Sequence, residues 1–171
     1  MTTPSGPVPP DSRAASLRML AIALGTAPLA VVAAMVFVLP TAWDDEPPVA
    51  VVLGLVALVG LAFATAELVG FAAPALTPQQ SAVEDAQAAS VAHFQTMMFL
   101  RFALTEMPIL VGLAVSFVLD HGLWPLLVTV VVGLPVLWFE VWPGRRNATR
   151  LARSLESGGV RSWLPEALGT A

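Results

Sequence analysis

The sequence predicts an all-α membrane protein in which four transmembrane helices form two antiparallel hairpins. Three observations lead to this fold class. Of the 171 residues, 57% are apolar and only 12% are charged, and the mean hydropathy is +0.79, which a soluble domain does not reach. The apolar residues gather in four stretches, each long enough for an α-helix to cross a bilayer. Together these stretches hold only 5 of the 20 charged residues.

The first two stretches carry one charge each. Residues 17–39 contain Arg18 at their edge, and residues 49–73 contain Glu67. The first stretch is too long, and too poor in a small-residue cleavage site, for a removed signal peptide. The head, residues 1–16, begins with many prolines and small polar residues, and we expect it to be disordered.

The last two stretches carry the remaining three charges. Residues 95–119 contain Arg101 and Glu106, and residues 122–142 contain Glu140. Buried helices of a large soluble core would need polar faces that these segments lack. The four segments are therefore predicted to be membrane spans.

A helix start is predicted in the polar loop after the second span. Thr77-Pro78-Gln79-Gln80 places threonine at the N-cap, proline at the first helical position and glutamine two residues later. Since no helix breaker follows before Pro108, we expect a helical extension over residues 78–94 that continues into the third span.

The tail, residues 143–171, is predicted to contain a short helix. Asn147 can cap its start, and Gly158-Gly159 marks its end. Leucines alternate with arginines at helical spacing, so the segment fits an amphipathic helix on the anionic inner leaflet. A solvated tail fits the same composition.

Arginine placement predicts the orientation. Seven of the eight arginines lie in or next to the two tails, whereas the loop after the first span carries Asp44, Asp45 and Glu46 and the loop at Asp120-His121 has no arginine. The positive-inside rule then places both termini in the cytoplasm. Rich in alanine, valine, leucine and arginine and without lysine, the composition is typical of a high-GC bacterium. We therefore expect a multi-pass protein of the plasma membrane.

The spans also contain an apparent internal repeat. A shift of 80 residues aligns the first span with the third at nine identical positions in twenty, including Pro28 with Pro108. Proline is costly inside a helix, so matched interior prolines favour a common origin. The two hairpins are thus predicted to be related by a parallel repeat, although the apolar composition alone also produces such matches.

Charged residues inside spans are candidate functional groups because each costs several kcal/mol unless it is paired or hydrated. Glu67 and Arg101 both lie about 9 Å from the cytoplasmic edge at ~1.5 Å per residue, so we expect them to pair across adjacent helices. The pair could orient the helices or act as a gate or counter-charge. Glu140, beside Arg145 and Arg146, is expected to be an interfacial anchor.

Glu106 lies closest to the middle of the bilayer. Arg101, five positions earlier, belongs to a different face of the same helix. A neutral, protonated carboxyl is the form expected at this depth. It could donate a structural hydrogen bond between helices, or it could bind and release a proton. Pro108 leaves the Leu104 carbonyl without its helical donor, which supplies an acceptor nearby.

The segment around Glu106 resembles the proton-carrying helix of rotary ATP synthase subunit c. The matching residues are Thr96-Met97-Met98-Phe99, then Ala103 to Ile109, then Gly112. The resemblance implies a helical hairpin with Glu106 as the ion-binding carboxyl. The chain departs from that family in the spacing of its proline, in its long polar loop and in the few glycines of the preceding helix.

Other classes of chemistry are absent from the sequence. Without cysteine there is no disulfide, thiolate metal site or thiol nucleophile, and without lysine there is no Schiff base or P-loop lysine. A net charge of −4 gives no footprint for nucleic acid. We find no nucleophile–base pair and no metal cluster, so we predict no catalytic residue, no metal, no cofactor and no enzymatic activity.

A third function, a membrane-embedded enzyme, lacks a catalytic constellation in the sequence. Two functions remain as hypotheses. The first is an accessory or structural subunit that acts through helix packing and through cytoplasmic contacts with partners. The alternative is a proton- or ion-coupled carrier that uses Glu106, with Glu67 and Arg101 as gate or counter-charge. The expected partners are the lipid bilayer and either further copies of the chain or another membrane protein.

Overall fold

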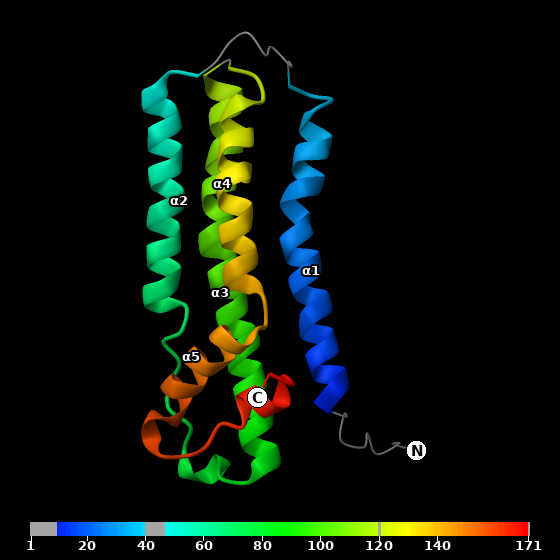
Figure 1. The fold of residues 1–171 in the computed structure, drawn as a ribbon, viewed down its shortest axis with the longest axis vertical. Helices are drawn as coiled ribbons and strands as arrows, with labels where there is room; N and C mark the ends of the chain where they lie inside the picture. The colour runs from blue at the N-terminus through cyan, green and yellow to red at the C-terminus, as the bar shows by residue number, and fades with distance from the viewer. Residues whose placement is uncertain (1–9, 40–46, 120, 171) are drawn as a thin grey trace. The chain divides into compact units, whose positions relative to one another are not determined.

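The computed structural model describes residues 10–39, 47–119 and 121–170, with side chains from Ala14 onward. These residues form helices and no strands, which confirms the predicted all-α class (Figure 1). In chain order the elements are α1 (Pro10–Met35), α2 (Val49–Val69), the 3₁₀ turn η1 (Pro78–Gln80), α3 (Val83–Val118), α4 (Trp124–Val141), α5 (Arg145–Leu155), the 3₁₀ turn η2 (Glu156–Gly158) and α6 (Leu164–Ala167).

Four of the described helices, α1 to α4, are long and apolar enough to cross a membrane. Their outer faces expose large apolar side chains, among them Leu61, Leu68, Phe117 and Val131. Water would penalise such a surface, whereas the hydrocarbon of a bilayer does not. Length, composition and exposure thus agree with the four predicted spans.

Residues 10–16 of the head are helical, where disorder was expected. Helix α1 begins at Pro10, so the prediction that residues 1–16 are disordered is wrong for residues 10–16. Proline suits the first turn of a helix because its fixed φ is already helical and it lacks only an N–H that would have no acceptor there. The acidic loop Asp44–Glu46 and the loop residue Asp120 lie outside the described residues.

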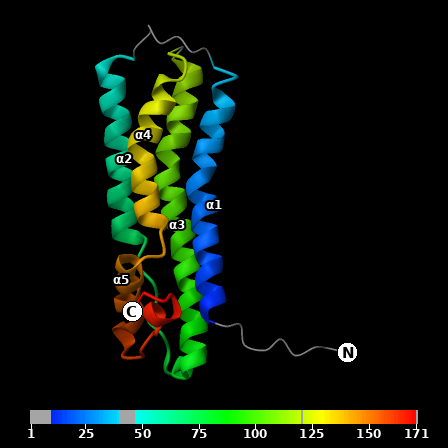
Figure 2. The same ribbon diagram turned by 45° about the vertical axis from the view of Figure 1, so that its right-hand side comes forward.

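The third span is the end of a longer helix that begins in the polar region after α2, as predicted. Helix α3 is 36 residues long and contains Pro108 in its interior. Figure 2 shows it as one continuous helix. Its start differs from the prediction, because the capping sequence forms the separate turn η1. There the Thr77 N–H and hydroxyl both donate to Gln80 Oε1, at 2.9 and 3.0 Å. The α-helix begins only at Val83.

The chain divides into two compact units. The span unit comprises Ile22–Gly70 and Met98–Val141, and the tail unit comprises the described parts of Met1–Ala21, Phe71–Met97 and Trp142–Ala171. Helices α1 and α3 each contribute residues to both units.

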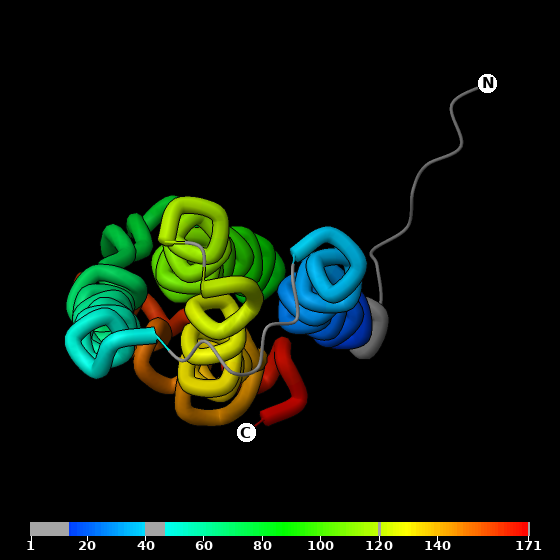
Figure 3. Tube along the Cα trace, turned by 90° about the horizontal axis from the view of Figure 1, so that it is seen from above, coloured from blue at the N-terminus to red at the C-terminus, as the bar shows by residue number. Residues whose placement is uncertain are grey.

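Within the span unit, α4 lies between α1 and α2 (Figure 3). On one side its Phe139 ring lies 6.3 Å from the ring of Phe63 in α2. On the other side the Trp138 ring lies so close to Gly25 of α1 that a β-carbon there would be 2.6 Å from Trp138 Cε2. Glycine thus permits the close approach of α1 and α4.

In the tail unit, the amphipathic helix of the tail is packed against protein. Leu151 and Leu155 of α5 are completely buried. Neither expected environment, a leaflet surface or a solvated tail, describes this face. The Leu155 carbonyl accepts from the Leu76 N–H at 2.9 Å, and the Ser154 hydroxyl donates to the Ala73 carbonyl at 2.8 Å and accepts from the Ala73 N–H at 3.1 Å. These bonds join α5 to the segment that follows α2.

The start of α5 also corrects the sequence analysis. Asn147 was expected to cap this helix, but Gly144 occupies the N-cap and Asn147 lies in the first turn. From there its Nδ2 donates to the Trp142 carbonyl at 2.9 Å. The end agrees with the prediction, because Gly159 follows η2 with a φ of +83°, a conformation that favours glycine.

Candidate functional site

The structure describes four charged residues of the span unit, and they differ in burial. Arg101 and Glu140 are completely buried, at 0% exposure. Glu67 and Glu106 are half-buried. A buried charge is costly unless an opposite charge or hydrogen bonds compensate it. The complete burial of Arg101 and Glu140 makes these two residues the candidates for a site within the span unit.

Arg101 is positioned by a glycine at the end of α2. A β-carbon on Gly70 would overlap Cγ of Arg101 and would lie 2.8 Å from its Cδ. The aliphatic stem of the arginine thus lies directly against the backbone of Gly70. Glu67 stands one turn earlier on α2, so its helix does approach Arg101 at the expected level. The ion pair between Glu67 and Arg101 stays a prediction.

The register of α3 and α4 is fixed by close contacts. The two helices are antiparallel: each step of three or four residues back along α3 is matched by a step of three or four residues forward along α4. The Leu126 N–H donates to the Ser116 hydroxyl at 3.1 Å. A β-carbon on Gly112 would lie 2.9 Å from the Pro125 carbonyl oxygen and would overlap the Thr129 side chain, and one on Gly133 would lie 3.4 Å from Ile109. The matched pairs are Ser116 with Leu126, Gly112 with Thr129, and Ile109 with Gly133.

Continued along both helices away from His121, this register places the two buried residues at a similar level. Eight residues before Ile109 is Arg101, and eight residues after Gly133 is the position next to Glu140. Antiparallel helices have the same rise per residue, so Arg101 and Glu140 lie at the same level. The register and the complete burial of both side chains identify Glu140 as a candidate member of the site.

Glu140 was expected to anchor the inner interface beside Arg145 and Arg146, and that role stays a prediction. What the sequence analysis missed is that its side chain is completely buried. The signal that could have identified it is its distance from the loop. Arg101 and Glu140 lie almost equally far from His121, on either side of a tight connection, and such residues meet in an antiparallel hairpin.

The buried hydroxyl groups of α3 and α4 form hydrogen bonds within their own helices. Thr105, one turn beyond Arg101 on α3, is buried, and its hydroxyl donates to the Arg101 carbonyl at 2.8 Å. The Thr129 hydroxyl donates to the Leu126 carbonyl at 2.9 Å, and the Ser116 hydroxyl donates to the Gly112 carbonyl at 3.0 Å. Each hydroxyl hydrogen is thus donated to a backbone carbonyl of the same helix.

Glu106 differs from the buried pair. The buried positions of α3 recur every three or four residues and include Met98, Arg101, Thr105, Ile109 and Gly112. Glu106 follows Thr105 directly, so it lies at the border of this stripe rather than within it. It forms no hydrogen bond or ion pair with any residue that the structure describes.

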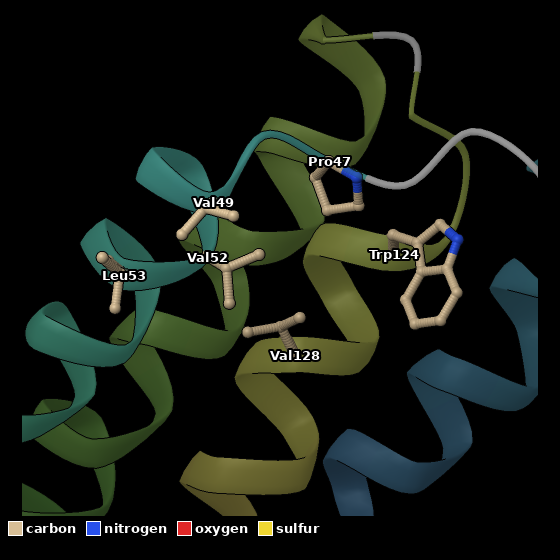
Figure 4. Close-up of a pocket in the computed structure, with 6 residues that line it drawn as sticks. All are labelled: Pro47, Val49, Val52, Leu53, Trp124 and Val128. Carbon is tan, nitrogen blue, oxygen red and sulfur yellow. The ribbon is translucent and has the colours of Figure 1, made fainter.

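A pocket lies at the opposite end of the same helices, between α2 and α4 (Figure 4). Its volume is about 370 Å³, and its lining has no charged side chain. The lining residues are Pro47, Val49, Val52, Leu53, Trp124 and Val128. The pocket can hold an apolar group and offers no ionisable group for acid–base chemistry.

The described residues contain no group of three or more histidine, aspartate or glutamate side chains that could hold a metal ion. Comparisons with protein-family models, with curated proteins and with solved structures found no match for this chain. The resemblance of residues 96–112 to subunit c therefore rests on those residues alone.

Proposed function

We propose that the chain is a small integral membrane protein with an accessory or structural role, which acts through its helix packing and through contacts of its cytoplasmic segments with partners. The observation that carries this proposal is the complete burial of Arg101 and Glu140 at one level of α3 and α4. A buried pair of opposite charges adds little net stability, but it penalises every arrangement that separates the two charges. It therefore suits a protein whose task is to hold one arrangement of helices.

In this proposal Arg101 forms an ion pair with Glu140, and the two residues clamp the inner ends of α3 and α4. Glu67 contributes a second acidic group from α2. The close contact of Arg101 with Gly70 supports the extension of the clamp to α2. Three of the four spans are then fixed to one another through one guanidinium group.

The proposal includes the finer arrangement of the spans. We infer two hairpins related by a parallel repeat, in a bacterial plasma membrane, with both termini in the cytoplasm. The repeat is supported by Pro28 and Pro108, which both lie inside their helices. The orientation is supported by the arginine-rich tails and the acidic outer loop.

A second candidate function is a proton- or ion-coupled carrier. It is favoured by Glu106, which is half-buried in the third span and forms no hydrogen bond or ion pair with the described residues. A carboxyl in that position can take up and release a proton without breaking a contact of the fold. The resemblance to subunit c implies the same role for this residue. Glu67 and Arg101 would then be the gate or counter-charge.

A flux measurement separates the two candidates. The purified chain is reconstituted in liposomes that contain a pH-sensitive dye, and a potassium diffusion potential is imposed. The accessory role predicts the same proton flux for the wild-type chain, for Glu106→Gln and for empty liposomes. A wild-type flux above that of empty liposomes, abolished by Glu106→Gln while the variant keeps its thermal stability, would overturn the accessory role in favour of the carrier.

A further inference from the structure

The apolar pocket between α2 and α4 takes no part in either function proposed above. Its volume is about 370 Å³, and all of its lining residues belong to the span unit (Figure 4). Small-molecule sites in proteins start at roughly 300 Å³, and an apolar cavity of about 150 Å³ already holds a benzene ring. The pocket is thus large enough for part of a lipid or for a small ligand.

The lining of the pocket selects an apolar occupant. Five of the six lining residues are valine, leucine or proline, and the sixth is Trp124. None of these side chains carries a charge. An ionised group would lose its hydration here without gaining an opposite charge, which makes its entry strongly unfavourable. The part of a ligand that enters the pocket is therefore a hydrocarbon group.

The pocket lies at one end of two candidate spans. Val49 is the first residue of α2, and Trp124 is the first residue of α4. The lining extends along each helix by four residues, to Leu53 and Val128. Four residues of an α-helix rise about 6 Å, so the pocket covers the outermost turn of both spans. In a bilayer this turn lies next to the headgroups, where tryptophan is enriched.

The rim of the pocket is open on the surface of the span unit. Val49 is 72% exposed and Leu53 is 62% exposed, whereas Val52 and Val128 are half-buried. A lipid chain beside α2 can therefore enter sideways without leaving the hydrocarbon. Lipid tails are as apolar as the walls, so van der Waals contacts decide whether the chain stays. A chain in the pocket has such contacts on several sides, and a chain on a flat helix surface has them on one.

We propose that this pocket binds the upper part of one acyl chain of a phospholipid, in the leaflet that surrounds the first turns of α2 and α4. The headgroup stays at the membrane surface and is not recognised by the lining. A hydrocarbon chain is favoured over a polar ligand by the uncharged walls, and its access is provided by the exposed rim. The site requires only that α2 and α4 lie in a bilayer. It is independent of the accessory role, since it involves none of the span charges.

The test uses the full chain in nanodiscs that contain phosphatidylcholine with a diazirine in the upper half of one acyl chain. After illumination, mass spectrometry of the digested chain locates the labelled residues. Val52, Leu53 and Val128 are expected to carry more label than Phe117 of α3. Phe117 is 57% exposed and lies at the same level of the bundle, because the neighbouring Ser116 bonds to Leu126 of α4.

A matched pair of variants separates the pocket from the lipid-exposed surface in general. Val128→Phe fills the pocket with a ring and should abolish the excess label at Val52 and Leu53. Val131→Phe places the same ring one turn further along α4, at a position that is 71% exposed and outside the pocket, and should preserve the label. Melting temperatures show whether each variant is folded. If Val128→Phe unfolds, Val52→Phe fills the pocket from α2, and the label is read at Leu53 and Val128.

The proposal is overturned if the wild-type chain carries equal label at the pocket and at Phe117, or if filling the pocket leaves the label unchanged. Phosphatidylglycerol with the same labelled chain should give the same pattern, because the lining does not contact the headgroup. A pattern that depends on the headgroup would contradict the pocket as the binding site. If Val128→Phe dissociates a dimer in native mass spectrometry and leaves the label unchanged, a second copy of the chain occupies the pocket instead of a lipid.

Discussion

Glycine residues decide how closely the spans approach one another, and they differ sharply in their surroundings. Gly112 lies against Thr129 and the Pro125 carbonyl, whereas Gly54 has open space where a side chain would begin. The same substitution at the two positions therefore separates packing from helix propensity. In a soluble helix interior, alanine is favoured over glycine by about 0.5–1 kcal/mol.

Gly112→Ala is expected to lower the free energy of unfolding by about 1–3 kcal/mol, because the added methyl group overlaps the buried Thr129 side chain and meets a backbone oxygen. Gly54→Ala should leave stability unchanged or raise it slightly. Tryptophan fluorescence during thermal unfolding in detergent measures both. Equal effects of the two variants would contradict the close contact of α3 with α4 at Gly112.

At this scale the sequence identifies which residues are unusual, and the partners that it suggests for them stay predictions. Arg101, Glu67, Glu106 and Glu140 are all evident as charges in apolar spans. Depth along the helix suggested Glu67 as the partner of Arg101, and sequence proximity suggested arginines of the tail as partners of Glu140. The burial of Glu140 depends on the face that α4 turns toward α3, which the nearly uniform apolar character of the spans does not reveal.

Among the elements, α5 is an amphipathic helix whose apolar face was expected to contact lipid or water and instead packs against protein. Its alternation of leucine and arginine predicts the helix correctly, but a leaflet and a protein core are equally apolar to such a face. The structure buries that face through long-range contacts, in particular the two hydrogen bonds between Ser154 and Ala73, which are 81 residues apart. A local pattern contains no information about that partner.

Ser154→Ala is expected to loosen α5, because the Ala73 N–H and carbonyl each lose a partner. The cost is about 1–3 kcal/mol for the two bonds. Ser157→Ala is the matched control, since the Ser157 hydroxyl is exposed and donates only to the nearby Ser154 carbonyl at 2.8 Å. Trypsin cleavage after Arg150 and Arg153 measures the effect.

Faster cleavage is expected in Ser154→Ala and not in Ser157→Ala. If neither substitution changes the rate, the contact between α5 and the segment after α2 does not hold the tail unit together.

The helix boundaries also show what a local sequence pattern cannot predict. The span regions were predicted well because hydrophobicity extends over twenty residues, whereas the starts of α1, α3 and α5 were each misplaced by several residues.

For the molecule as a whole, the feature that the sequence predicts best is the membrane environment of its helices. Four apolar segments and an arginine-rich C-terminal tail are properties of composition, and they need no knowledge of tertiary contacts. The order of contacts between the spans and the packing of the tail depend on specific side chains. Those features required the structure.

The proposed orientation predicts the behaviour of reporter fusions. Alkaline phosphatase inserted in the loop between α1 and α2, after Thr41, should be active because that loop faces the periplasm. Green fluorescent protein fused after the last residue should fluoresce because the tail remains in the cytoplasm. An inactive phosphatase together with a non-fluorescent C-terminal fusion would reverse the topology.

The clamp of Arg101 with Glu140 is tested most directly by a double-mutant cycle, measured as the free energy of unfolding in mixed detergent micelles. Arg101→Leu and Glu140→Leu should each destabilise the chain by about 3–5 kcal/mol, because each leaves one buried charge without its counterpart. The double variant should be more stable than the sum of the two effects predicts, and Glu67→Leu should couple more weakly to Arg101→Leu. Strictly additive effects of Arg101→Leu and Glu140→Leu would contradict the clamp. Strong coupling of Arg101→Leu to Glu67→Leu alone would indicate that Arg101 pairs with Glu67 of α2 instead.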